Sequence, residues 1–173
     1  MRGTTRGSPP RVSRHEIAWS WIGAFFGIGL VAWVNQFFFE SLDHSLMIGS
    51  FGASAVLVYG AVRSPLAQPR NLVGGHIVSA AVGVICWKLF HPYPWLAQAV
   101  AVASATALMH ATRTLHPPGG ATALIAVIGS DRIHNLGFLY VLIPATVVPL
   151  VLLAVALVVN NIPKSRRYPE IWF

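Results

Sequence analysis

Residues 112–129 read Thr-Arg-Thr-Leu-His-Pro-Pro-Gly-Gly-Ala-Thr-Ala-Leu-Ile-Ala-Val-Ile-Gly, and no other stretch says more about the fold. A polar corner broken by proline and glycine leads into an apolar run that is too short for an ordinary membrane-spanning helix. Inside hydrocarbon every backbone N–H and C=O needs a partner, so broken backbone persists there only where protein surrounds it or where it lines a watery cavity. The stretch therefore predicts a permeation site.

The composition is that of an integral membrane protein. Of the 173 residues, 55% are hydrophobic and 10% are charged, whereas a soluble domain carries about 25% charged residues. The net charge is +7, and the basic residues gather near the two ends of the chain. We attribute this distribution to the positive-inside bias of membrane topology. A lipid bilayer is the expected surrounding, and no nucleic-acid partner is expected.

The sequence predicts an all-α, polytopic membrane helix bundle with about six segments. Prolines lie at or beside most segment boundaries, and Pro144 and Pro149 lie inside the last segment, where they are expected to kink it. The second and fifth segments are short. The six segments cover residues 16–39, 46–62, 71–90, 95–112, 119–129 and 136–160.

The charge distribution also predicts the domain organisation. A basic N-terminal tail is expected over residues 1–15, a transmembrane domain over 16–161 and a basic C-terminal tail over 162–173. Because both tails are basic, both termini are expected on the cytoplasmic side, in a bacterial inner membrane. Two cytoplasmic termini require an even number of crossings. Six crossings place Arg63, Arg70 and Arg113 on the cytoplasmic side, so six are preferred over four.

The two short segments share a local sequence. Gly52-Ala-Ser-Ala-Val-Leu-Val58 is echoed by Gly120-Ala-Thr-Ala-Leu-Ile-Ala126, although small and aliphatic residues are common enough in membrane helices for a chance match. The positions of the two stretches favour inverted halves, over residues 16–90 and 94–161. If each segment becomes helical only at this sequence, two helix N-termini face each other inside the membrane. Their free N–H groups would bind a small anion.

The predicted anion site combines backbone amides and hydroxyls of the two short segments with basic side chains nearby. Arg113 is equally well explained as an anchor at the membrane surface. His76 is equally well explained as a neutral histidine bonded to a carbonyl group, and His116 as a tie that holds broken backbone together. The predicted substrate-binding residues are Gly52, Ala53, Ser54, His76, Arg113, His116, Gly119, Gly120, Ala121 and Thr122.

Catalysis, cofactors and metals are not expected. Apart from Glu16 at the start of the first segment, the membrane segments hold no Asp or Glu for acid–base chemistry, and no phosphate-binding loop or dinucleotide pattern is present. His110 and His116 lack the spacing and the additional Cys or carboxylate of a metal site. The spacings Gly23-x-x-x-Gly27 and Ala99-x-x-x-Ala103-x-x-x-Ala107 predict close helix packing, within the chain or between copies. A bundle this small is expected to form a homo-oligomer.

Several motifs resemble the HPP family of integral membrane proteins, named for a His-Pro-Pro sequence that stands here at residues 116–118. They are Ser64-Pro-Leu-Ala-Gln-Pro-Arg-Asn71, Gly74-Gly-His76, residues 112–123 and Asn160-Asn161 with Tyr168-Pro169. Plant and cyanobacterial members are associated with nitrite transport, so the resemblance implies transport of a small inorganic anion, with nitrite favoured. Members are often described with four crossings.

Some bacterial members of the family carry CBS domains. A membrane scaffold or sensory subunit that acts through a protein partner is therefore the alternative function. The sequence leaves open whether transport follows a channel or a carrier mechanism, and which ion is coupled to it.

Overall fold

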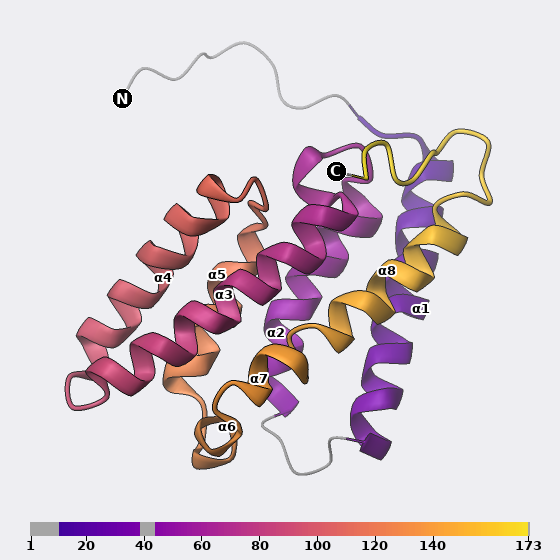
Figure 1. Ribbon diagram of the computed structural model, residues 1–173. Coiled ribbons are helices and arrows are strands. Elements are labelled where there is room, and N and C mark those ends of the chain that lie inside the picture. Colours follow the sequence, from indigo (N-terminus) through magenta and orange to yellow (C-terminus); the bar gives the residue numbers. More distant parts are fainter. Residues whose placement is uncertain (1–10, 39–43, 173) are drawn as a thin grey trace.

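The computed structural model describes residues 11–38 and 44–172, and the regular elements in these ranges are helices. Successive long helices alternate in direction (Figure 1). The start of α1, the connections 61–68 and 112–116 and the segment after α8 therefore lie at one end of the bundle, termed the terminal end. The elements are α1 Arg14–Phe38, α2 His44–Ala55, the π-helix η1 Val56–Gly60, the 3₁₀ turn η2 Pro65–Ala67, α3 Pro69–Phe90, α4 Pro94–Ala111, α5 Pro117–Ile128, α6 Asp131–Leu136, α7 Leu139–Leu142 and α8 Val147–Val159.

The lengths and compositions of the helices fit a membrane protein. Three helical stretches are long and apolar enough to cross a membrane, namely Arg14–Gln36, Pro69–Phe90 and Leu139–Val159. Two shorter apolar helices, Gly49–Gly60 and Pro117–Ile128, accompany them. The prediction of an all-α membrane bundle is thereby confirmed for the described residues. The six crossings and the inverted halves stay predictions.

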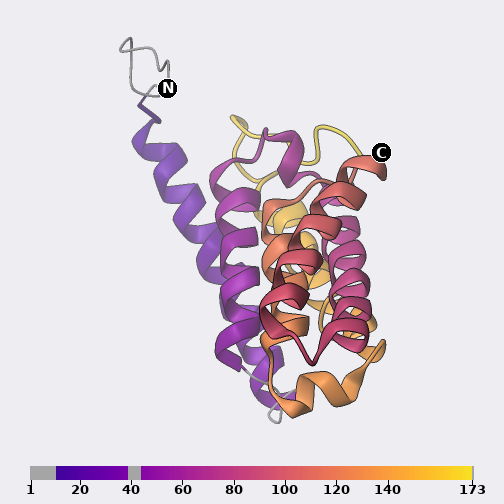
Figure 2. The ribbon, with the colours of Figure 1, turned by 90° about the vertical axis from the view of Figure 1, so that its left-hand side faces the viewer.

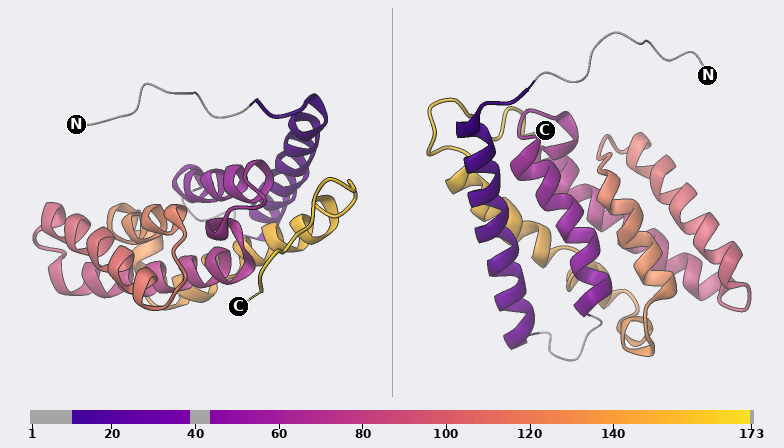
Figure 3. Two further views of the ribbon diagram at one scale, coloured as in Figure 1. Left: turned by 90° about the horizontal axis from the view of Figure 1, so that it is seen from above. Right: turned by 180° about the vertical axis from the view of Figure 1, so that it is seen from behind.

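The helices are arranged in two layers. Seen from behind, α1, α2, α5 and α4 stand in a row, with α3 and α8 crossing on the far side (Figure 3). α3 packs most extensively against α5 and α4, and α8 packs against α1. The start of α1 leans away from its neighbours at the terminal end (Figure 2). The short α5 is thus enclosed by α2, α3 and α4.

Prolines set the helix boundaries much as predicted. Pro69, Pro94 and Pro117 are the first residues of α3, α4 and α5. At this position an N–H would have no partner within the helix, so proline, which lacks one, loses no hydrogen bond. Pro144 lies in the break between α7 and α8, as expected. Pro149 instead lies in the first turn of α8, where a proline is tolerated for the same reason.

The second segment differs from its prediction. α2 begins at His44 and remains helical through Gly52, Ala53 and Ser54, after which η1 continues to Gly60. The amides of these residues thus belong to the helix interior, and the N-terminus of α2 lies at the end opposite the start of α5 (Figure 1). The predicted pair of facing helix N-termini is wrong, because a glycine lowers helix propensity without ending a helix.

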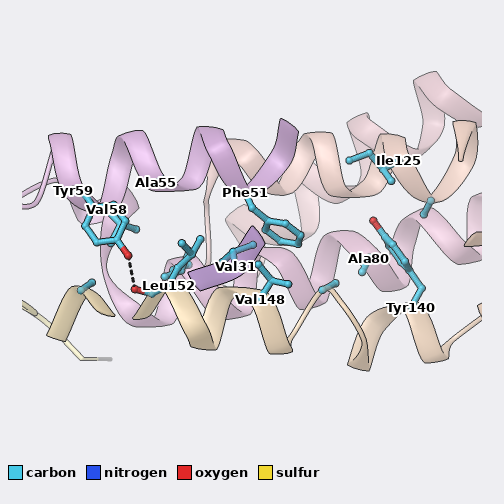
Figure 4. Packing of buried hydrophobic residues seen from close by; sticks show 14 of the residues in the cluster. Val31, Phe51, Ala55, Val58, Tyr59, Ala80, Ile125, Tyr140, Val148 and Leu152 are labelled. Atoms are coloured by element: carbon cyan, nitrogen blue, oxygen red, sulfur yellow. Dashed lines mark hydrogen bonds between the residues drawn. The ribbon is translucent and has the colours of Figure 1, made fainter. Parts of the chain in front are cut away.

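The Gly23-x-x-x-Gly27 spacing brings helices together within one chain. The ring of Tyr59, from η1, lies over both glycines, and a Cβ atom added to Gly23 would be 2.6 Å from Tyr59 Cδ1. The Tyr59 hydroxyl donates to the carbonyl oxygen of Leu152 in α8 at 2.9 Å (Figure 4). Because Gly23 and Gly27 have no side chains, the Tyr59 ring fits against α1 and joins α1, η1 and α8.

The alanines of α4 divide between two faces. Ala97, Ala101 and Ala105 are buried against α3 and α5 in a small core cluster. The predicted stripe of Ala99, Ala103 and Ala107 is exposed on the opposite face. Within the part of the chain that the structure describes, that stripe therefore makes no close helix contact.

The C-terminal segment is fastened to the terminal end by a buried arginine. Arg166 donates to the Glu16 carboxylate at 2.8 Å, and its side chain is 3% exposed. Its other donors bond to the carbonyl oxygens of Glu16 and Tyr59 and to Asn160 Oδ1 and Ser20 Oγ. The residue joins α1, η1 and the end of α8, although the sequence indicated only a basic tail here.

Candidate functional site

Five polar side chains meet in the interior of the bundle and are linked by hydrogen bonds. Each of these side chains belongs to a residue that is at most 1% exposed. They are termed the buried polar chain, and they are Ser50 and Ser54 of α2, His76 of α3, His116 of the 112–116 connection and Thr122 of α5.

The first half of the buried polar chain joins the two histidines. His116 Nδ1 is 2.8 Å from the carbonyl oxygen of Leu66, in η2. On the other side of the ring, His116 Nε2 is 2.9 Å from Ser54 Oγ. Ser54 Oγ is also 2.8 Å from His76 Nε2. One serine hydroxyl thus bridges two imidazole rings.

The second half continues from His76 into α5 and returns to α2. His76 Nδ1 is 2.7 Å from Thr122 Oγ1, and Thr122 Oγ1 is 2.7 Å from Ser50 Oγ. Ser50 Oγ is 2.9 Å from the carbonyl oxygen of Pro118. All these separations lie within hydrogen-bonding range, so the chain is continuous from η2 to the start of α5.

Glycines let the backbones of α3 and the start of α5 approach closely enough for these contacts. A Cβ atom added to Gly75 would lie 2.5 Å from His116 Cβ and 2.8 Å from the carbonyl oxygen of Thr114. A Cβ atom added to Gly119 would lie 2.9 Å from the carbonyl oxygen of Gly75. With no side chains in the way, the ring centroids of His76 and His116 come within 5.1 Å of each other.

The 112–116 connection begins with an unusual residue. The N–H of Thr114 bonds to the carbonyl oxygen of Met109 at 2.8 Å, and the N–H of Arg113 bonds to that of His110 at 3.1 Å. This pair of bonds is the Schellman ending of a helix, in which the left-handed position is usually glycine. Arg113 occupies that position with φ 57°. An arginine in this position is strained where glycine would not be.

Arg113 lines a pocket at the terminal end of the bundle. The pocket has a volume of about 250 Å³. Arg70 and Asn71, at the start of α3, hold the neighbouring connection by donating to the carbonyl oxygens of Thr112 and Leu115, each at 2.8 Å. Among the described residues, two arginines and no carboxylate side chain line the pocket, so these side chains give it a positive charge. Its lining residues are Pro65, Gln68, Arg70, Asn71, Arg113, Ile171 and Trp172.

The structure gathers some of the predicted site residues and separates others. Ser54, His76, His116 and Thr122 are in direct contact, whereas Arg113 lies at the surface pocket. The remaining predicted residues, which are glycines and alanines, contribute no side-chain hydrogen bond to the buried polar chain. Gly119 is buried against α3, Gly120 and Ala121 are partly buried, Ala53 is exposed, and a Cβ atom added to Gly52 would meet no other atom within 4 Å.

Sequence reasoning missed Ser50. It lies four positions before Ser54, so the two side chains share one face of a helix. That spacing would have identified Ser50 had the second segment been interpreted as helical from its beginning.

The chemistry available at the buried polar chain is hydrogen bonding and proton exchange. Its members are hydroxyl groups and imidazole rings, and histidine ordinarily titrates near neutral pH. Within residues 11–38 and 44–172, no group of three or more His, Cys, Asp or Glu is placed to hold a metal ion. The chain of contacts therefore offers donors for an anion and sites for a proton.

An apolar bundle with a hydrogen-bonded polar interior defines a polytopic α-helical membrane protein. Over residues 9–169 the sequence matches the family described as HPP, transmembrane region. The chain belongs to this family, as the motifs around His116 indicated.

Two proteins of Dictyostelium discoideum, both named as transmembrane proteins, are similar to the chain. Each is 44% identical to it, over 169 and 170 residues, which cover 96% and 95% of the chain. The chain covers 54% and 59% of these relatives, a little over half of their length. No solved structure matches the chain.

Proposed function

We propose that this protein transports a small inorganic anion, with nitrite favoured by the family resemblance. One observation carries the proposal. A pocket lined by Arg70 and Arg113 lies beside the turn whose Leu66 carbonyl group accepts a hydrogen bond from the buried polar chain. A positively charged entrance thus adjoins a polar path inside an apolar bundle.

Each part of this arrangement has a physical role in anion movement. The two guanidinium groups raise the local concentration of anions at the terminal end. The start of α5 adds the partial positive charge of a helix N-terminus. Further inside, hydroxyl and imidazole groups replace water as hydrogen-bond donors. These groups now bond to one another at 2.7–2.9 Å, so an anion passes only if they separate, which favours a carrier over an open channel.

We further propose that the terminal end faces the cytoplasm. Arg63, Arg70 and Arg113 all lie there, as the positive-inside rule requires of cytoplasmic connections. Six crossings with inverted halves remain part of this proposal. A bacterial inner membrane is the expected location, although the two similar proteins belong to a eukaryote.

We also propose that the protein forms a homo-oligomer. The exposed stripe of Ala99, Ala103 and Ala107 on α4 is the surface suited to a second copy, because small residues let membrane helices approach closely.

Uptake by the purified chain in liposomes tests the function. Wild-type protein should take up nitrite faster than protein-free liposomes, and nitrate, formate and chloride establish selectivity. Arg113→Gln should lower the initial rate about tenfold, because it removes half of the pocket's positive charge. Arg167→Gln is the matched control, since Arg167 is exposed in the C-terminal segment and outside the pocket lining. Uptake equal to that of empty liposomes for every anion would overturn the proposal and favour the scaffold or sensory function.

A further inference from the structure

We propose that the buried polar chain holds one mobile proton, which is exchanged between His116 and His76 through Ser54 and accompanies the transported anion. The exchange itself is argued from hydrogen-bond geometry. Its pairing with an anion rests on the proposed function.

When both rings are neutral, five side-chain hydrogens serve six contacts, and the arrangement proposed here leaves the contact between Ser50 and Pro118 without a hydrogen. Because His116 Nδ1 faces the carbonyl oxygen of Leu66, that nitrogen carries the hydrogen and Nε2 is an acceptor. Ser54 then donates to His116 Nε2, at 2.9 Å, in preference to the carbonyl oxygen of Ser50, which lies 3.2 Å from Ser54 Oγ. With its one hydrogen used, Ser54 can only accept from His76 Nε2. His76 therefore carries its hydrogen on Nε2.

The same count continues to the far end. His76 Nδ1, which is now an acceptor, receives the hydroxyl hydrogen of Thr122. Thr122 must accept from Ser50 in turn. Every contact between side chains then has one hydrogen, and the contact between Ser50 and the carbonyl oxygen of Pro118 has none. All the donated hydrogens therefore point along the chain toward the carbonyl oxygen of Leu66.

One additional proton reverses that direction without moving a heavy atom. With the proton on His116 Nε2, the ring donates to Ser54, and Ser54 donates to His76 Nε2. The hydrogen of His76 is now on Nδ1 and is donated to Thr122. Thr122 donates to Ser50, and Ser50 donates to the carbonyl oxygen of Pro118, which received no hydrogen from Ser50 in the neutral arrangement. Each of the six contacts from η2 to α5 is then filled.

The extra proton can also rest on His76. Both His76 nitrogens then donate, to Ser54 and to Thr122, while Ser54 donates to His116 as in the neutral state. The two charged forms differ by one hydrogen moved from His116 Nε2 to Ser54 and one moved from Ser54 to His76 Nε2. No bond between heavy atoms is made or broken, so the exchange requires no co-reactant.

The surroundings of the chain explain why the proton should travel with an anion. A further titratable group, Tyr140, lies beside the chain, and its hydroxyl donates to the backbone carbonyl oxygen of Thr122 at 3.1 Å. The side chains bonded to the buried polar chain include no Asp, Glu, Lys or Arg among the described residues. The free energy of an unpaired positive charge is high in such a buried place. An anion nearby lowers that free energy, and the protonated chain in turn attracts the anion.

Nitrogen NMR of the whole protein in lipid bilayers tests the exchange directly. In protein labelled with ¹⁵N-histidine, His76→Gln and His116→Gln identify the two signals among seven histidines. Above pH 7 the rings should be opposite tautomers, with the hydrogen of His116 on Nδ1 and that of His76 on Nε2. Acidification should add one proton that both rings share. Identical tautomers, or two protons bound independently, would overturn the proposal.

Accumulation against a gradient tests the coupling. With the membrane potential held at zero and the interior one pH unit more alkaline, cotransport of one proton per anion supports about tenfold accumulation. The probe is the anion that wild-type protein takes up fastest, with the flux into protein-free liposomes subtracted. Ser54→Ala should lower the accumulation ratio to about one, because the methyl group cannot bridge the rings. A ratio of ten in this variant would overturn the relay.

A matched control and an independent measurement complete the design. Ser79→Ala should keep the tenfold ratio, since Ser79 is equally buried on α3 but its hydroxyl donates to Met109 Sδ, at 3.5 Å, and lies outside the buried polar chain. If Ser54→Ala fails to fold, the tautomers of the wild-type rings decide the question. Opposite tautomers in a protein that transports no anion would retain the proton exchange and reject the proposed function.

Discussion

Replacing Arg113 by glycine should make the protein more stable and less active at once. Arg113 adopts φ 57° at the end of α4, and a residue with a Cβ atom pays about 1–2 kcal/mol for that conformation. Glycine relieves this strain but loses more chain entropy on folding, by about 0.5–1 kcal/mol. The net gain is about 1 kcal/mol, since the exposed side chain contributes little packing.

Thermal unfolding in detergent and uptake into liposomes measure the two effects. For a chain of this size a gain of 1 kcal/mol corresponds to a rise in Tm of about 2–4 °C, while uptake should fall as far as in Arg113→Gln. Arg113→Ala separates the causes, because it removes the charge and keeps the Cβ atom. It should lose uptake without the rise in Tm. An Arg113→Gly variant with wild-type uptake would remove the side chain from the mechanism, and one with a lower Tm would refute the strain argument.

Three further substitutions examine the site and its support. Thr122→Val keeps the shape of the side chain but removes the hydroxyl, so initial anion uptake should fall while the yield of folded protein stays unchanged; full uptake would exclude this hydroxyl from the route. Gly27→Ala should lower the unfolding free energy by about 1–3 kcal/mol through a clash with the Tyr59 ring, whereas Gly29→Ala, which meets open space, should change it little; equal effects would contradict the packing. Arg166→Met should lower the unfolding free energy by about 3 kcal/mol, and an unchanged Tm would show that its hydrogen bonds add no net stability.

Local signals in the sequence were enough to predict most of the helices. Proline fixes the start of a helix through its own covalent structure, which is why the boundaries at Pro69, Pro94 and Pro117 could be predicted. Glycine only weakens a helix, and packing of the surrounding bundle decides whether the helix continues. For that reason the start of α2 was misplaced and Ser50 was overlooked.

The candidate site was predictable in composition but not in arrangement. Ser54 and Thr122 were identified from the repeated Gly-Ala-(Ser/Thr) sequence, and His116 from the His-Pro-Pro motif. His76 was identified because polar side chains are rare in membrane segments. Their mutual contacts depend on how α2, α3 and α5 cross, and no local pattern specifies that crossing. The burial of Arg166 could not be predicted for the same reason. In a basic tail the sequence does not distinguish a buried arginine from one exposed at the membrane surface, because the difference depends on residues far away in the chain.

The way the C-terminal segment is held has a consequence for larger architectures. The Tyr168 hydroxyl donates to the carbonyl oxygen of Ala67, and Gln68 accepts from the N–H of Glu170, so Ile171 and Trp172 form one wall of the arginine pocket. A regulatory module joined after this segment would emerge at the mouth of the pocket. Such a module would be connected through Gln68 to the neighbouring turn, whose Leu66 carbonyl group accepts from His116.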